Sequence, residues 1–221
     1  METVVVGGVQ SSTGVVPFGS GTAVAHKTGW KLVSADGQAY PVSELGGRVR
    51  SGEHLCVLYE TEEHRQRVVG AYVGHGLVLE EKVIYLAGAR VQREVKHQVG
   101  IQGVFADKCE GTRQLEAHSV ADLRLTNGAM SPYVLTDWVR REAQRAAQEG
   151  YTALRLLLDM SWLLREKTGH GLIMAYERRL SDTIPPNCIV MCEYMATLVD
   201  GNLMVDLIRA HRQAVIGHLV V

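Results

Sequence analysis

The sequence predicts an α/β fold, in which a mostly parallel sheet is covered by helices on both faces. From about residue 53, short apolar runs that suit buried strands alternate with longer segments of helical periodicity. Buried parallel strands are apolar on both faces, and helices provide the crossovers between them. Residues 1–50 are instead rich in Gly, Val, Ser and Thr and have no helical periodicity. We therefore expect a β-rich arm over residues 1–50 and an α/β domain over residues 51–221.

Composition indicates an ordered protein without an extended charged surface. Of the 221 residues, 46% are apolar and 21% are charged, and the formal net charge is −1. Such a balance gives no overall field that would attract nucleic acid or anionic lipid, so neither is an expected partner. The apolar runs are far shorter than the roughly 18 to 20 residues of a membrane span. The first residues lack the basic and apolar regions of a secretory signal, and we expect a cytoplasmic protein with reduced cysteines.

The N-terminal arm is expected to consist of short strands. Val-rich stretches separated by Gly and Ser predict strands at residues 4–6, 15–16 and 22–25. A hairpin is expected between residues 30–33 and 39–42, because Asp36-Gly37 favours a tight turn. Exposed hairpin edges pair readily with other strands. The arm is thus expected to join the edge of the main sheet or another subunit, and a homodimer is expected.

The first half of the α/β domain contains a clear strand, helix, strand pattern. Residues 54–59 form a short apolar strand, and Thr61 follows as a helix cap with acidic residues in the first turn. The next apolar strand is residues 82–87. The residues expected to face inward from the helix are Val68, Val69, Tyr72, Val73 and Leu79.

The second half repeats this alternation less regularly. Residues 90–130 predict one short helix and a strand near residues 114–120. Ser131-Pro132 then begins a long helix that ends at Gly150. Both ends are expected because proline is favoured in the first turn of a helix and glycine just after the last turn. The remaining expected elements are a strand at 153–158, a helix at 172–180, a strand at 188–192, a helix at 203–210 and a strand at 214–221.

Polar and aromatic side chains follow three of these strands. In open α/β sheets, ligands bind outside the carboxyl ends of the strands, and a mixture of rings, carboxylates and a thiol suits a small, partly apolar molecule. The residues expected to line this crevice are Tyr59, Glu60, Asp159, Trp162, Cys192 and Tyr194.

The same peptides resemble a known sensory family. Residues 54–63, Asp159-Met160-Ser161-Trp162 and Cys192-Glu193-Tyr194, in this order and spacing, are similar to the MEDS family, the methanogen/methylotroph sensory domain named from a dichloromethane-responsive repressor. The resemblance covers roughly residues 50–221. It implies a RecA-like fold related to the circadian-clock ATPases, and the sensing of small hydrocarbon derivatives. The family commonly has Glu where this chain has Asp159, and no helix-turn-helix is expected before residue 50.

No catalytic motif is apparent, so we expect neither an enzyme nor catalytic residues. Hydrolysis of ATP needs a glycine-rich loop with a lysine that reaches the phosphates. The loop after the first strand is Glu60-Thr61-Glu62-Glu63, which has no glycine and no lysine. Its carboxylates would repel a triphosphate, so ATP is not an expected cofactor, and the identity of any cofactor stays open.

A metal site is an alternative use of the histidine and cysteine residues. His54 and Cys56 are two apart on one strand and share a face, and Cys192 could join them if its strand were adjacent. Cys188 and Cys192 would lie about 13 Å apart on a straight strand, too far for one ion. Buried cysteines are more often ordinary core residues. His211 follows the last helix, where capping is the expected role.

The leading hypothesis is a non-catalytic sensing or regulatory protein that binds a small organic ligand, hydrocarbon-derived or methylated, and signals through an oligomer or a protein partner. One alternative is a metal- or cofactor-dependent enzyme, or a metal sensor, that uses His54, Cys56 and Cys192. Another is a structural oligomerisation protein built through the N-terminal arm.

Overall fold

The computed structural model describes residues 31–33, 39–41, 45, 49–87, 113–123, 131–216 and 219–220. The strands predicted at residues 4–6, 15–16 and 22–25, and most of the predicted short helix and loops of residues 90–130, lie outside these residues. Among the described residues, no helix combines the length and apolar composition needed to cross a bilayer.

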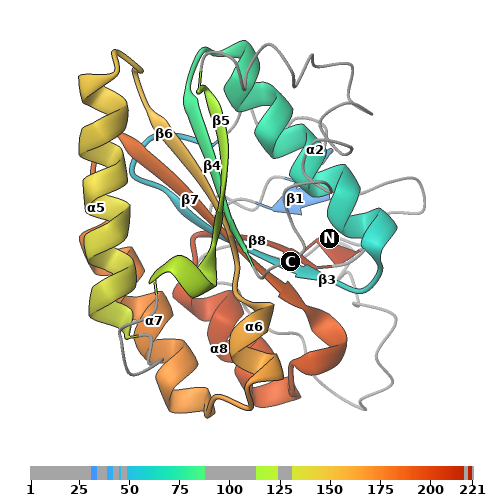
Figure 1. The fold of residues 1–221 in the computed structure, drawn as a ribbon. Helices are drawn as coiled ribbons and strands as arrows, with labels where there is room; N and C mark the ends of the chain where they lie inside the picture. Colours follow the sequence, from blue (N-terminus) through green and yellow to red (C-terminus); the bar gives the residue numbers. More distant parts are fainter. Residues whose placement is uncertain are drawn as a thin grey trace.

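Among the residues that the structure describes, six parallel strands form the centre of the fold (Figure 1). They are β3 (His54–Tyr59), β4 (Lys82–Ala87), β5 (Leu115–Ser119), β6 (Leu154–Asp159), β7 (Cys188–Met195) and β8 (Gln213–Ile216). Their order across the sheet is β8-β3-β7-β6-β4-β5. Every residue of β3, β4 and β6 is buried, as expected for strands covered on both faces. The predicted α/β class is confirmed.

The sheet is extended at the β8 edge by antiparallel strands. β1 (Lys31–Val33) and β2 (Ala39–Pro41) pair with each other, and β1 pairs with β8. The expected hairpin thus joins the edge of the main sheet. The prediction of one final strand over residues 214–221 is wrong, because β8 is followed by a separate β9 (Leu219–Val220) that pairs with it antiparallel. Only two residues separate these strands, which is the commonest spacing of a hairpin link.

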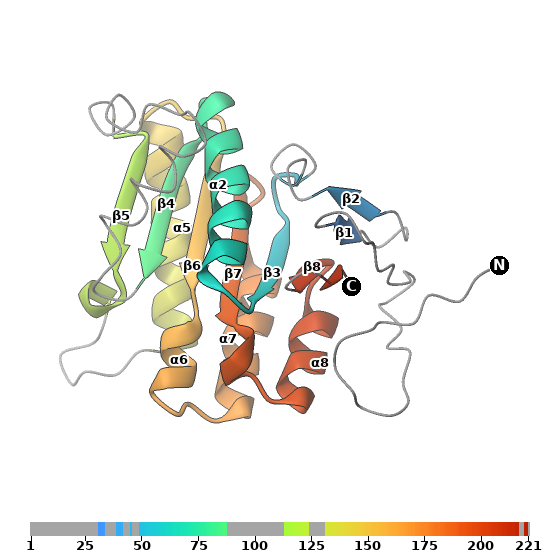
Figure 2. The ribbon, with the colours of Figure 1, turned by 90° about the vertical axis from the view of Figure 1, so that its right-hand side faces the viewer.

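Helices cover the two faces of the sheet unequally (Figures 1 and 2). They are α2 (Glu62–Val78), α5 (Pro132–Gln148), α6 (Ser161–Arg165), α7 (His170–Thr183) and α8 (Gly201–Ala210), with short 3₁₀ turns η2 (Val120–Leu123) and η3 (Ala196–Leu198). One face packs against α2 and the other against α5, α7 and α8. We call them the α2 face and the α7 face.

Local capping explains where the predicted helices begin. The Thr61 side chain accepts a hydrogen bond from His64 N, and the Ser131 side chain accepts one from Val134 N. Both are N-caps, as predicted from the sequence. Gly150 follows α5 with a φ of 93°, a left-handed conformation that glycine adopts at little cost. The prediction that Leu79 faces inward is wrong, because this residue lies beyond the last turn of α2 and is 50% exposed.

Side chains alternate between the two faces along each strand. Cys56 and Leu58 of β3 pack in the core of the α7 face, whereas Leu55, Val57 and Tyr59 pack in the core of the α2 face. The same alternation along β6 and β7 decides which polar residues can meet.

Helix α2 approaches the sheet closely at Gly76. A Cβ atom placed there would lie 2.8 Å from Cδ of Arg155, a fully buried side chain on β6. Arg155 is held in place because its Nε donates to Glu81 Oε2 at 2.6 Å. The absence of a side chain at residue 76 is therefore a packing requirement.

We expect Gly76→Ala to destabilise the protein by about 1–3 kcal/mol, because overpacking against Arg155 outweighs the gain in helix propensity. Urea denaturation measures the change. Gly171→Ala in α7 is the matched control, since nothing lies within 4 Å of its added Cβ, and it should leave the free energy of unfolding unchanged or higher. Equal behaviour of the two variants would contradict the packing argument.

An ionic network joins α5 to the start of β4 and to β5. Lys82 Nζ donates to Glu116 Oε1 and to Glu149 Oε2, both at 2.7 Å, and Arg145 Nη2 donates to Glu116 Oε2 at 2.7 Å. Burial alone would raise the pKa of Glu116, but the hydrogen bonds from Arg145 and Lys82 hold it well below the ordinary 4.5. Such a group stabilises the fold fully above its unfolded pKa and less as the pH falls towards its folded pKa.

We expect Glu116→Gln to lower the free energy of unfolding near neutral pH by about 1–3 kcal/mol. The difference from the parent protein should narrow as the pH falls below 4.5, because the unfolded parent then binds a proton at Glu116 that the folded protein still excludes. Urea titrations at a series of pH values measure it. Asp137→Asn, which removes an exposed pair with Arg140, is the control and should change stability by less than about 0.5 kcal/mol. A constant Glu116→Gln difference down to acid pH would contradict the prediction.

Candidate functional site

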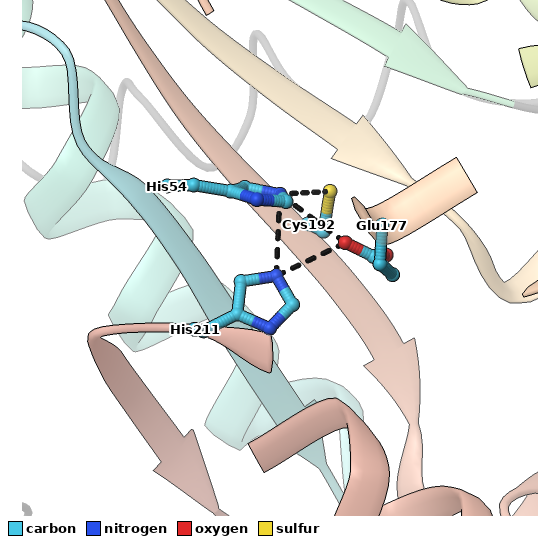
Figure 3. A group of neighbouring side chains, drawn as sticks. All are labelled: His54, Glu177, Cys192 and His211. Carbon is cyan, nitrogen blue, oxygen red and sulfur yellow. Dashed lines mark hydrogen bonds and ion pairs between the residues drawn. The ribbon is translucent and has the colours of Figure 1, made fainter. Parts of the chain in front are cut away.

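Four side chains with metal-binding or proton-binding atoms meet on the α7 face (Figure 3). His54, Glu177, Cys192 and His211 each point one nitrogen, oxygen or sulfur atom toward the others, and these atoms all lie within 4.8 Å of one another. Each residue is at most 6% exposed. We call this group the four-residue cluster.

The contacts within the cluster are short. His54 Nε2 lies 3.2 Å from Cys192 Sγ and 3.2 Å from His211 Nε2. Glu177 Oε2 lies 3.2 Å from His54 Nε2 and 3.0 Å from His211 Nε2. The two imidazoles therefore direct the same type of nitrogen into one small volume beside a carboxylate and a thiol.

The fold brings these residues together from distant parts of the sequence. His54 is the first residue of β3 and Cys192 lies on β7, which pairs with β3 so that Cys192 is opposite Cys56. Glu177 is on the buried side of α7, and His211 is the C-cap of α8. The cluster is thus enclosed by two neighbouring strands and by the two helices that cover them.

Each cluster residue except Cys192 is oriented by a second partner on its far side. The remaining ring nitrogen of His211, Nδ1, donates to the Leu207 carbonyl at 2.7 Å. His54 Nδ1 lies 2.8 Å from the hydroxyl of Ser181. The hydroxyl of Tyr194 bonds to the other carboxylate oxygen of Glu177. A proton on both Nδ1 atoms leaves both Nε2 lone pairs directed into the cluster.

Burial and mutual charge decide the protonation of the cluster. Burial, followed by the charge of His211, lowers the pKa of His54 to about 4, so this ring is neutral at pH 7. Burial, followed by the Glu177 carboxylate, raises the pKa of Cys192 well above its usual value, so it is a thiol. Burial would also raise the pKa of Glu177, but His211 and His54 hold it below the usual range. The cluster therefore contains a buried carboxylate beside a neutral ring.

One atom of the cluster lacks a well-directed partner. Glu177 Oε2 is close to both imidazoles, yet it accepts no hydrogen bond of acceptable geometry from the described residues. The distances to the imidazoles would allow a hydrogen bond to Glu177 Oε2, but the geometry does not, and a hydrogen bond requires both.

A surface groove lies directly outside the cluster. It has a volume of about 410 Å³ and is lined by residues of α7 and α8: Met174, Arg178, Ser181, Asp182, Asp206, Arg209 and Ala210. Ser181 is exposed and its hydroxyl is also the partner of His54. Ser181 is therefore shared by the lining of the groove and the contacts of the cluster.

A second polar group occupies the α2 face at the carboxyl ends of the strands. The fully buried Glu193 of β7 accepts hydrogen bonds from Arg65 Nε at 2.9 Å and from the Tyr85 hydroxyl at 2.6 Å. Burial raises the pKa of Glu193, although Arg65 opposes this. Nearby, the hydroxyl of Tyr59 lies 3.4 Å from that of Ser161.

The predicted ligand residues separate between the two faces. Tyr59 packs in the core of the α2 face, and strand alternation places Asp159 on that face too, where Ser161 N donates to its Oδ1 at 2.9 Å. Cys192 and Tyr194 pack in the core of the α7 face. The sheet therefore lies between these two pairs of side chains.

The other two predicted ligand residues differ in exposure. Glu60 is exposed at the end of β3. Trp162 is 8% exposed and packs in the core of the α7 face, with its ring edge-to-face against Tyr176 at a centroid distance of 6.2 Å. Its contacts are those of a core residue.

The structure brings together two of the three predicted metal candidates. His54 and Cys192 are neighbours, whereas Cys56 packs in the core and its sulfur is not in the cluster. Sequence reasoning missed Glu177 and assigned His211 to helix capping, which it does perform. A signal for Glu177 exists, since it is four residues after Ile173 and so shares the buried stripe of α7.

Comparison with models of known protein families gives a match. A family model described as MEthanogen/methylotroph, DcmR Sensory domain (MEDS) matches residues 53–212. The matched segment starts immediately before His54 and ends immediately after His211, so it contains the whole four-residue cluster. No curated protein matches the sequence.

We expect Arg65→Met to destabilise the protein by about 3–5 kcal/mol, because it leaves the Glu193 carboxylate buried without its cation. Adding Glu193→Gln to Arg65→Met should recover part of that loss, since the double variant carries no buried charge there. Urea denaturation of both variants measures the effects.

Arg67→Met on the same helix is the control, because Arg67 is exposed and pairs with the exposed Glu63. It should change stability by less than about 1 kcal/mol. An Arg65→Met variant as stable as Arg67→Met would show that this buried pair does not hold the α2 face together.

Proposed function

The chain belongs to the methanogen/methylotroph, DcmR sensory (MEDS) domain family, and on this basis we propose that it is a regulatory domain that senses a small organic molecule. The family match supports a sensing role, and the groove between α7 and α8 supports a place for the ligand. Binding there would be communicated to a second subunit or to a protein partner, because a sensory domain acts through another molecule.

The observation that carries the proposal is the position of the groove over the four-residue cluster. Its volume of about 410 Å³ lies within the range of small-molecule sites. Met174 and Ala210 supply apolar surface, and the charged lining residues are of both signs: Arg178, Arg209, Asp182 and Asp206. This lining suits a small, partly apolar molecule with polar groups.

The groove also has a physical route by which occupancy changes the interior. Ser181 contributes to the groove and bonds to His54, so a ligand that recruits its hydroxyl alters the hydrogen bonding of that ring. Both walls are cluster-bearing elements, since α7 carries Glu177 and α8 ends at His211. A ligand that moves either helix changes the spacing of the buried groups.

The predicted crevice at the carboxyl ends of the strands is a second candidate binding site for the same ligand. Tyr59, Asp159 and Ser161 lie together there on the α2 face. Their polar atoms are engaged with one another, whereas the groove residues border open volume. We therefore place the ligand in the groove, and variants at both positions separate the two locations.

We expect thermal unfolding in the presence of small organic compounds to reveal a ligand class. Suitable panels are methylated amines, short-chain alcohols, halogenated hydrocarbons and small carboxylates. A saturating ligand at about a hundred times its Kd should raise the Tm by about 5–10 °C, because binding to the folded state alone adds about 2.7 kcal/mol.

Groove variants test where such a ligand binds. Arg209→Ala and Asp182→Ala should reduce the shift, whereas Arg67→Ala on the opposite face should leave it unchanged. A shift reduced by Asp159→Asn and not by the groove variants would move the site to the carboxyl ends of the strands. No shift with any compound class would count against the sensing of small molecules.

A further inference from the structure

We propose that His54, Glu177, Cys192 and His211 form a binding site for one Zn²⁺ ion or a similar borderline transition metal. This goes beyond the proposed function, because the site lies inside the protein, adjacent to the groove, and does not depend on an organic ligand. It rests on the convergence, the chemistry and the support of the four side chains.

The spacing of the donor atoms fits a tetrahedral ion. Bonds of about 2.0–2.3 Å from zinc to nitrogen, oxygen and sulfur place tetrahedral donors about 3.3–3.6 Å apart. The two Nε2 atoms are separated by 3.2 Å, and they lie 3.2 and 3.0 Å from Glu177 Oε2. Cys192 Sγ lies 3.2 Å from His54 Nε2. The remaining two pairs, both with Cys192 Sγ, lie within 4.8 Å, so small side-chain movements would complete the geometry.

The donor set is typical of zinc. Two imidazole nitrogens, one thiol sulfur and one carboxylate oxygen are ligand types that zinc accepts, and softer or harder ions prefer more uniform sets. The thiol would lose its proton to solvent on binding, as metal-bound cysteine does. A divalent ion with one thiolate, one carboxylate and two neutral rings carries no net charge, which suits a buried position.

The unsatisfied oxygen of Glu177 is a separate indication of a ligand. The side chain is fully buried, yet its Oε2 accepts no well-directed hydrogen bond from the described residues. A bound cation would satisfy this atom and would also use the two nitrogens that face each other at 3.2 Å. In a metal-free hydrogen-bonded network, one of those nitrogens must instead carry a proton to avoid facing a second lone pair.

The outer contacts match those of metal-bound side chains. Ligating histidines usually donate their other N–H to a carbonyl, carboxylate or hydroxyl group that fixes the ring. Leu207 O serves His211 at 2.7 Å and the Ser181 hydroxyl serves His54 at 2.8 Å. Tyr194 holds the second oxygen of Glu177. Because four protein donors fill a tetrahedral ion, the site is of the closed structural type, without the open position that catalysis needs.

Metal analysis and cobalt substitution test the site on the full chain. Protein purified after growth with added zinc should contain one zinc per chain. After removal of the metal with a chelator, Co²⁺ should restore one equivalent and give intense visible absorption with a sulfur-to-cobalt charge-transfer band.

Substitutions identify the donors. Cys192→Ser should abolish the charge-transfer band and weaken Zn²⁺ binding at least about a hundredfold, and Glu177→Gln should weaken it without removing the band. Ser181→Ala, an exposed position, should weaken binding about 10–100-fold with the spectrum retained. The matched control is Cys56→Ser, because Cys56 is also buried and lies opposite Cys192 in the β3–β7 register; it should bind as the parent does.

Several results would overturn the site: no stoichiometric metal, a cobalt spectrum without a sulfur band, or equal losses in Cys56→Ser and Cys192→Ser. Circular dichroism of each metal-free variant reports whether it folds. If Cys192→Ser does not fold, the cobalt spectrum of the parent protein and the metal affinity of Ser181→Ala still test the metal site. If organic compounds raise the Tm but the protein binds no metal, only the metal site is rejected. If the protein binds metal but no compound raises the Tm, only the proposal of an organic ligand is rejected.

Discussion

Burial of the Glu177 carboxylate between α7 and the sheet constrains the whole α7 face. A charged carboxylate removed from water is costly unless partners compensate it. Here the compensation comes from imidazoles on β3 and after α8 and from the Tyr194 hydroxyl on β7. The positions of two strands and two helices are therefore tied to one side chain. Burial would raise the pKa of Glu177, but His211 and His54 hold it below its usual range.

Strand β7 carries a buried carboxylate to one face and a cluster thiol to the other. Glu193 faces α2 and meets Arg65, whose charge is permanent at any physiological pH. Cys192, the preceding residue, faces α7 and meets His54, whose charge depends on its surroundings. The α2 face is consequently stabilised by a fixed ion pair, while the α7 face contains groups whose protonation or ligation can change. This difference is why we place the responsive part of the domain on the α7 face.

Much of the fold was predictable because its signals are local. Thr61 and Ser131 cap the helices that their sequences predict, and the apolar runs 54–59 and 82–87 are strands with those bounds. The cluster was less accessible, since the order β8-β3-β7 brings residues 54 and 211 together only after the sheet is assembled. The prediction of one crevice did not take into account that side chains alternate between the two faces of a strand. Tyr59 is three residues after Cys56 on β3, so its side chain must lie on the face opposite to that of Cys56. Residue parity separates the two groups once the registers between β3, β7 and β6 are known.

Helix α7 presents the groove and the buried carboxylate within a short stretch. Met174, Arg178 and Ser181 contribute to the groove, and Glu177 lies among them in sequence but points to the sheet. These positions lie within about two turns of one helix, so they move as one rigid unit. An outward displacement of this segment that widens the groove would draw the carboxylate away from both imidazoles. One helix therefore joins the groove on its solvent side to the buried carboxylate on its inner side.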